Sequence, residues 1–153
     1  MNDETINDLL NYNNIKIYQN KNYFNFSLDS ILLPNFVQLN KNINKILDLC
    51  TGNIPVPLVL STKTDAKIYA VEIQKEIYEL ALKTLRINKL ENKIVLINDD
   101  AKNAINNFET DSFDLITCNP PYFKCTDKSI KNDNKIKSIA RHEIMITLED
   151  III

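Results

Sequence analysis

The tetrapeptide Asn119-Pro120-Pro121-Tyr122 combines groups that suit methyl transfer to a planar nitrogen. Such a nitrogen shares its lone pair with an adjacent ring or carbonyl and is therefore a poor nucleophile. The Asn119 side-chain carbonyl and the Pro120 backbone carbonyl can each accept one N–H of an NH2 group, which turns the lone pair toward an electrophile. Pro121 stiffens the turn, and Tyr122 offers a face on which a heterocycle can stack. Alone, the tetrapeptide is equally well explained as a loop after a strand.

Short apolar segments that alternate with helical segments must position this loop. The predicted strands are 45–49, 68–72, 94–97 and 113–118. Between residues 73 and 88 the apolar side chains recur at helical spacing, so one face of a helix is expected to pack on a sheet. Strands and helices joined by short loops favour an α/β fold with a doubly wound, mostly parallel sheet.

Each predicted strand ends at or near a polar residue, namely Asp48, Glu72, Asp100 and Asn119. Ligands of parallel α/β sheets bind beyond the carboxyl ends of the strands, so we predict that these four side chains line one site. A lone Asp after a strand is more often a turn or a helix cap, and Asp99 makes the assignment of Asp100 ambiguous by one position. The set is more specific than any of its members.

Composition limits the class of protein. The chain has 153 residues, 44% of them hydrophobic and 25% charged, which predicts a single globular domain. A net charge of −2 gives no overall attraction for nucleic acid. Its sequence contains no apolar run of membrane-spanning length and no signal peptide. Three cysteines without C-x-x-C spacing favour reduced thiols and a cytoplasmic location.

The segment Asp48-Leu49-Cys50-Thr51-Gly52-Asn53 resembles the first nucleotide-binding turn of S-adenosylmethionine-dependent methyltransferases. Its glycine would let the backbone approach the cofactor, whose amino-acid portion Asp48 would contact. Glu72 follows Asp48 by 24 residues, close to the usual spacing of a carboxylate that binds ribose hydroxyls. Asp100 would accept from the adenine amine of the cofactor, with Ile73 covering the ring. NAD is disfavoured because the chain has no G-x-G-x-x-G.

Several stretches together resemble bacterial tRNA (adenine-N(6))-methyltransferases that modify the anticodon loop of a valine tRNA. The matching residues are 26–33, 48–53, 71–74, 117–124 and 140–144. The resemblance implies a Rossmann-like class I methyltransferase sheet, S-adenosylmethionine as donor, a flipped-out tRNA adenine as acceptor, and neither metal nor membrane. It assigns cofactor binding to Asp48, Gly52, Glu72 and Asp100, and the target base to Asn119, Pro120 and Tyr122.

Two features depart from this family. Ile54 stands where a second glycine is usual, and a β-branched residue there is expected to resist a positive φ and to push its side chain toward the ligand. The residues 147–150 are typical of a helix start, yet only three isoleucines follow. We therefore expect one incomplete domain, 1–153, with an N-terminal extension (1–40) and a Rossmann-like core (41–153) that lacks its C-terminal strands.

The remaining segments give weaker predictions. Residues 23–26 alternate as a strand does, and Ser27 is predicted to cap a helix that contains Pro34. Six basic residues between 124 and 141 would meet tRNA phosphates, although a solvated loop explains them equally well. His142 is given no catalytic role. Two other functions stay open: methylation of a glutamine amide in a protein, which poses the same planar-nitrogen problem, and a non-catalytic remnant.

Overall fold

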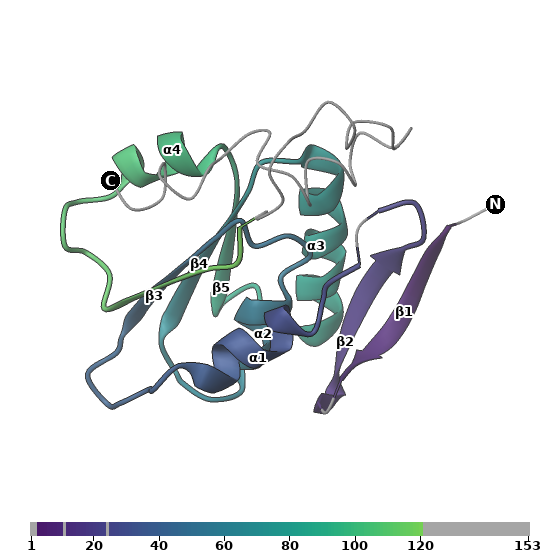
Figure 1. The fold of residues 1–153 in the computed structure, drawn as a ribbon, viewed down its shortest axis with the longest axis horizontal. Helices are drawn as coiled ribbons and strands as arrows, with labels where there is room; N and C mark the ends of the chain where they lie inside the picture. The colour runs from purple at the N-terminus through teal and green to yellow at the C-terminus, as the bar shows by residue number, and fades with distance from the viewer. Residues whose placement is uncertain (1–2, 11, 24, 121–153) are drawn as a thin grey trace.

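The computed structural model describes residues 3–10, 12–23 and 25–120 (Figure 1). Its elements follow in the order β1 (Glu4–Leu9), β2 (Tyr12–Asn20), α1 (Asp29–Phe36), β3 (Lys45–Leu49), α2 (Pro55–Ser61), β4 (Lys67–Glu72), α3 (Lys75–Asn88), β5 (Ile94–Asn98), α4 (Ala101–Ala104), the 3-10 turn η1 (Ile105–Asn107) and β6 (Leu115–Cys118). The four strands and the long helix predicted from the sequence are therefore present, with ends displaced by two residues or fewer.

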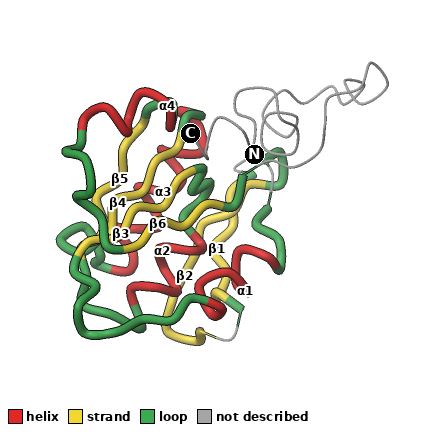
Figure 2. The backbone as a smooth tube through the Cα atoms, turned by 60° about the vertical axis from the view of Figure 1, so that its left-hand side comes forward, coloured by secondary structure: helices red, strands yellow, loops and turns green. Residues whose placement is uncertain are grey.

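The central sheet has four strands in the order β5-β4-β3-β6 (Figure 2). All three neighbouring pairs are parallel, so the carboxyl ends of the strands lie at one edge, as predicted. In the register, Asp48 lies opposite Ala70 on one side and Thr117 on the other. Within the described ranges, β6 pairs with β3 alone, and Ile116 on β6 is 53% exposed.

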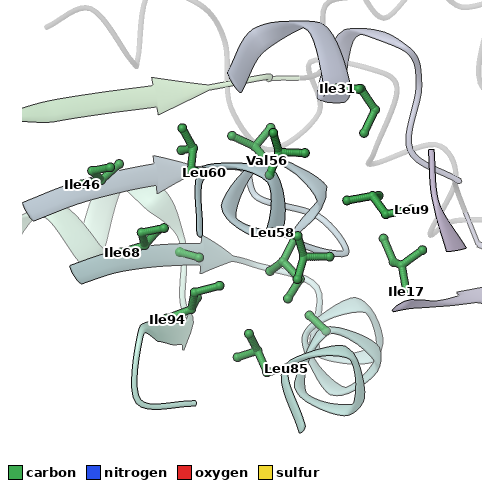
Figure 3. Packing of buried hydrophobic residues seen from close by; sticks show 14 of the residues in the cluster. Leu9, Ile17, Ile31, Ile46, Val56, Leu58, Leu60, Ile68, Leu85 and Ile94 are labelled. Atoms are coloured by element: carbon green, nitrogen blue, oxygen red, sulfur yellow. The ribbon is translucent and has the colours of Figure 1, made fainter. Parts of the chain in front are cut away.

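Alternation along the strands divides the core between the two faces of the sheet. Ile46, Ile68 and Ile94 lie side by side on three strands and pack with α2, α3 and the N-terminal hairpin (Figure 3). Leu47 and Val71 face the other way, toward α4 and the turn that follows it. The sheet is thus covered on both faces, which confirms the doubly wound α/β prediction. The longest described helix, α3, has 14 residues, and none of the described helices could cross a bilayer.

The N-terminal residues form an antiparallel hairpin of β1 and β2 that the sequence did not predict. Its buried side chains, Leu9 and Ile17, belong to the main core (Figure 3). The hairpin is also hydrogen-bonded to α3, where the Tyr18 N–H donates to Thr84 Oγ1 at 3.0 Å. The predicted strand at 23–26 is wrong, because the Tyr23 N–H closes a turn on the Asn20 carbonyl at 2.9 Å.

Helix α1 begins one residue later than predicted. Its N-cap is Leu28 rather than Ser27, because the Leu28 carbonyl accepts the first helical hydrogen bonds, from the N–H groups of Ile31 and Leu32. The Ser27 hydroxyl instead donates to the Asp29 carboxylate at 3.3 Å. Pro34 lies inside the helix as predicted, and it has no N–H to donate to the carbonyl four residues earlier.

Candidate functional site

The carboxyl edge of the sheet brings together most of the residues that the sequence singled out. Strands β3, β4 and β6 end there in neighbouring positions, and they place Asp48, Glu72 and Asn119 at the same edge. Asp100 follows β5 at the far side of that edge. Tyr122, Pro121, the basic segment 124–141, His142 and the predicted helix start at 147–150 lie outside the described residues.

Asp48 is a buried carboxyl, 1% exposed, at the end of the central strand β3. Its two oxygens accept hydrogen bonds from hydroxyls on either side: Thr51 Oγ1 donates to Oδ2 at 2.5 Å, and Thr117 Oγ1 donates to Oδ1 at 2.6 Å. Burial raises the pKa of Asp48 to about 7, against the opposing effect of these two hydrogen bonds. Asp48 therefore joins β3 to the following turn and to β6, and its carboxyl can bind a polar or cationic group.

Glu72 is the second buried carboxyl, 6% exposed, at the end of β4. Its Oε2 accepts from the Gly52 N–H at 2.9 Å, and its Oε1 accepts from the Gln74 N–H at 2.8 Å. Burial raises the pKa of Glu72 to about 7, although backbone N–H groups oppose the rise. The side chain thus holds the turn after β3 against the turn after β4, and each oxygen keeps a second lone pair for a ligand hydroxyl.

The turn after β3 has an unusual backbone, with positive φ at Cys50 (55°), Gly52 (57°) and Ile54 (56°). No atom lies within 4 Å of the point where a Cβ on Gly52 would stand, so open space faces this glycine. The structure keeps the positive φ at Ile54, which costs on the order of 1–3 kcal/mol for such a residue. The predicted direction of its side chain is wrong: Ile54 is fully buried in the main core rather than turned toward a ligand.

Helix α2 follows this turn at once, with Pro55 in its first turn, where no N–H is needed. Asn53, beside Ile54, is buried and donates through Nδ2 to the Tyr18 carbonyl of the hairpin. Its Oδ1 is a buried acceptor with no hydrogen-bond partner in the described part of the chain. An unpaired buried acceptor in a native fold calls for a partner, such as water or a donor group of a ligand.

The far side of the edge shows a structural role for Asp100. Its Oδ1 accepts from the Lys102 N–H at 2.9 Å, and its carbonyl accepts from the first turns of α4, so Asp100 caps that helix. Asp99 makes only a local contact there, accepting the Asp100 N–H at 2.7 Å. Ile73 is half-buried. The cofactor roles of Asp100 and Ile73 stay predictions.

Asn119 follows β6 and is half-buried, as is Pro120. The Asn119 Nδ2 donates to Oγ of Ser30 on α1 at 3.1 Å. Sequence reasoning gave no role to Ser30, Thr51 or Thr117. All three lie in stretches that resemble the family. Spacing along the chain shows neither that Thr117 meets Asp48, 69 positions away, nor that Ser30 meets Asn119, 89 positions away.

Two thiols also lie at this edge, since Cys118 ends β6 and Cys50 directly follows β3. A hydrogen bond with the Cys118 thiol, together with burial, raises the pKa of the Cys50 thiol. Cys50 therefore stays a neutral thiol at ordinary pH. In the described ranges, no three His, Cys, Asp or Glu side chains converge as metal ligands would.

Comparison with known proteins agrees with this geometry. A relative from Flavobacterium psychrophilum named tRNA1(Val) (adenine(37)-N6)-methyltransferase is 26% identical over 145 residues, which cover 94% of this chain and 60% of the relative. A release factor glutamine methyltransferase from Thermodesulfovibrio yellowstonii is 32% identical over 108 residues, covering 70% of this chain and 37% of that protein. The chain thus spans less than two thirds of either relative's length.

The fold is shared with a SAM-dependent methyltransferase from Agrobacterium tumefaciens, whose crystal structure gives a TM-score of 0.61 at 21% identity over 80% of this chain and 41% of that one. Residues 27–143 match the family described as Methyltransferase small domain. This segment includes β3 to β6 and every residue described above at the carboxyl edge. The chain therefore belongs to the methyltransferase small domain family.

Proposed function

We propose that the chain transfers a methyl group from S-adenosylmethionine to the exocyclic amine of an adenine in the anticodon loop of a tRNA, in the cytoplasm. The observation that carries the proposal is the position of Asn119 and Pro120. They follow β6 directly, next to the strand whose end holds the buried Asp48. An acceptor pair for an NH2 group therefore adjoins the turn that resembles a cofactor site.

The residues around Gly52 fit S-adenosylmethionine chemically. The open space at Gly52 lets a ligand approach the backbone, and the Asn53 Oδ1 is a buried acceptor that no described residue pairs. Glu72, held by two backbone N–H groups, can accept ribose hydroxyls, and Asp48 can face the ammonium group of the amino-acid portion. When bound, this cofactor supplies a methyl group on a positively charged sulfur, which needs no further activation by a metal.

Asn119 and Pro120 would act on the other substrate, the adenine of the tRNA. Asn119 Oδ1 and the Pro120 carbonyl would each accept one N–H of the adenine amine. These hydrogen bonds favour a tetrahedral nitrogen, whose lone pair is no longer delocalised into the ring, and so they are stronger in the transition state than in the ground state. Asn119 is half-buried, so its hydrogen bonds compete less with water than they would at an open surface.

The test incubates the chain with S-adenosylmethionine labelled in its methyl group, together with either tRNA or a peptide-chain release factor. The proposal predicts label in N6-methyladenosine of the tRNA. Substitution Asn119→Ala should abolish this transfer, whereas Asn22→Ala, on the exposed turn after β2, should not. Label in a glutamine of the release factor alone would contradict the proposal and favour the glutamine methyltransferase that the Thermodesulfovibrio relative represents. Label in neither would favour a non-catalytic remnant.

A further inference from the structure

A hydroxyl group on a distant helix holds the side chain of Asn119. The Asn119 Nδ2 donates to Ser30 Oγ at 3.1 Å, across 89 positions of the chain. Ser30 lies in the first turn of α1 and is 6% exposed, so water competes little for this hydroxyl. Helix α1 thereby contacts the residue that follows β6, at the edge where the proposed methyl transfer takes place.

The two ends of the Asn119 carboxamide are not equivalent for that reaction. The oxygen accepts hydrogen bonds, whereas the NH2 group can only donate them. A substrate amine with two N–H groups needs acceptors, so a carboxamide turned by 180° would direct its own N–H groups at those of the substrate. Only one of the two orientations of Asn119 is therefore productive.

The geometry points to Ser30 as the residue that holds the Asn119 side chain in place. In the observed arrangement the NH2 end donates to Ser30 Oγ, and the Oδ1 end is left to accept from a substrate amine. We infer that Ser30 is a positioning residue for methyl transfer, which acts through Asn119 without contacting the substrate itself. This inference rests on the proposed function, because the productive orientation is defined by an amine acceptor.

The anchoring of α1 explains why a hydroxyl there can hold a fixed position. Pro34 is buried in the same helix, and the Lys63 Nζ donates to its carbonyl at 3.0 Å and to Asn35 Oδ1 at 2.6 Å. Ile31, next to Ser30, is buried in the main core (Figure 3). Ser30 is thus placed by a helix whose following residues are tied to the core and to Lys63.

The experiment uses the full chain and two serine variants. Ser30→Ala removes the acceptor, and Ser61→Ala is the matched control, since the Ser61 hydroxyl also lies in a helix but donates to the Leu58 carbonyl of its own turn at 2.7 Å. The first readout needs no activity. In a nitrogen–proton correlation spectrum, the side-chain amide signals of Asn119 are those that vanish in Asn119→Asp. They should shift in Ser30→Ala and stay unchanged in Ser61→Ala.

The second readout is steady-state methyl transfer to tRNA. Loss of one orienting hydrogen bond should lower kcat by about threefold to tenfold in Ser30→Ala, while KM for tRNA and the affinity for S-adenosylmethionine stay unchanged.

The outcomes separate this inference from the proposed function. Asn119 amide signals that do not move in Ser30→Ala would overturn the inference, as would a kcat that Ser30→Ala leaves unchanged. A weakened affinity for S-adenosylmethionine with unchanged kcat would also overturn it, because Ser30 would then act on the cofactor. If the unmodified chain transfers no methyl group, the proposed function fails, and the amide signals alone decide whether Ser30 holds Asn119.

Discussion

Replacing Asp48 by asparagine should make the ligand-free chain more stable at alkaline pH. Asp48 is 1% exposed, and burial raises its pKa from 3.8 to about 7. In the unfolded chain the same carboxyl ionises near 3.8, so between pH 3.8 and 7 the folded state binds more protons than the unfolded state. The resulting stability is fully present below pH 3.8 and is lost as the pH rises through 7.

The magnitude follows from the width of this interval. One pKa unit corresponds to about 1.36 kcal/mol, so between pH 5 and pH 9 the ionisation of Asp48 should cost about 2–3 kcal/mol of unfolding free energy. Glu72, whose pKa burial raises from 4.5 to about 7, should cost a similar amount over the same interval. Asp48→Asn is neutral at every pH and can still bond to Thr51 and Thr117, so it should remove about half of the pH dependence.

The assay is urea denaturation followed by circular dichroism at pH 5, 7 and 9 with reductant present, because the chain has no tryptophan. Asp48→Asn should gain stability relative to the unmodified chain as the pH rises, because only the unmodified chain must ionise a buried carboxyl. The difference in unfolding free energy between the two should grow by about 2–3 kcal/mol from pH 5 to pH 9.

Asp114→Asn is the control for this prediction. Asp114 is exposed, and the N–H groups of Asn44 and Lys45 donate to it at 2.8 and 2.9 Å. These hydrogen bonds lower its pKa, so its replacement should destabilise the chain equally at pH 5 and pH 9. A flat stability of the unmodified chain between pH 5 and 9, or an Asp48→Asn variant that is less stable at pH 9, would refute the reasoning.

Three further predictions concern the turn after β3. Ile54→Gly restores the glycine usual in the family and relieves about 1–3 kcal/mol of backbone strain. It also removes a fully buried side chain, which costs about 2–5 kcal/mol. Urea denaturation should therefore show net destabilisation, and a more stable variant would contradict this. Gly52→Ala should lower stability by only about 1 kcal/mol, because its Cβ meets open space, yet it should weaken calorimetric binding of S-adenosylmethionine at least about tenfold. Cys50, whose thiol pKa is raised, should resist alkylation by iodoacetamide at pH 8 in the folded chain. Mass spectrometry of the peptide that contains Cys50 can check this, and rapid modification would contradict a neutral thiol at this position.

The sheet and the edge of the site were predictable because both depend on local patterns. Buried strands such as β3 are short apolar runs, and α3 shows the helical spacing of an amphipathic segment. Parallel strands end at one edge, so Asp48, Glu72 and Asn119 could be placed together from their positions after strands alone.

The missed features depend on contacts between distant segments or on exposure. Strand β1 leaves nearly all its side chains exposed or half-exposed, and β2 is rich in asparagine, which disfavours strands, so the hairpin had no clear pattern. The direction of the Ile54 side chain depends on the core beneath it. Ser30 meets Asn119 only because α1 packs near the end of β6, which no spacing along the chain reveals.

Calorimetric titration of the chain with S-adenosylmethionine at pH 8, alongside the variant Glu72→Gln, tests the central claim most directly. The claim is that the carboxyl edge between β3 and β4 binds this cofactor beside the Asn119 loop. The account predicts saturable binding with one site per chain, weakened at least about tenfold by Glu72→Gln, since a carboxamide cannot replace both acceptor oxygens. Absence of binding, or binding that Glu72→Gln leaves unchanged, would contradict it.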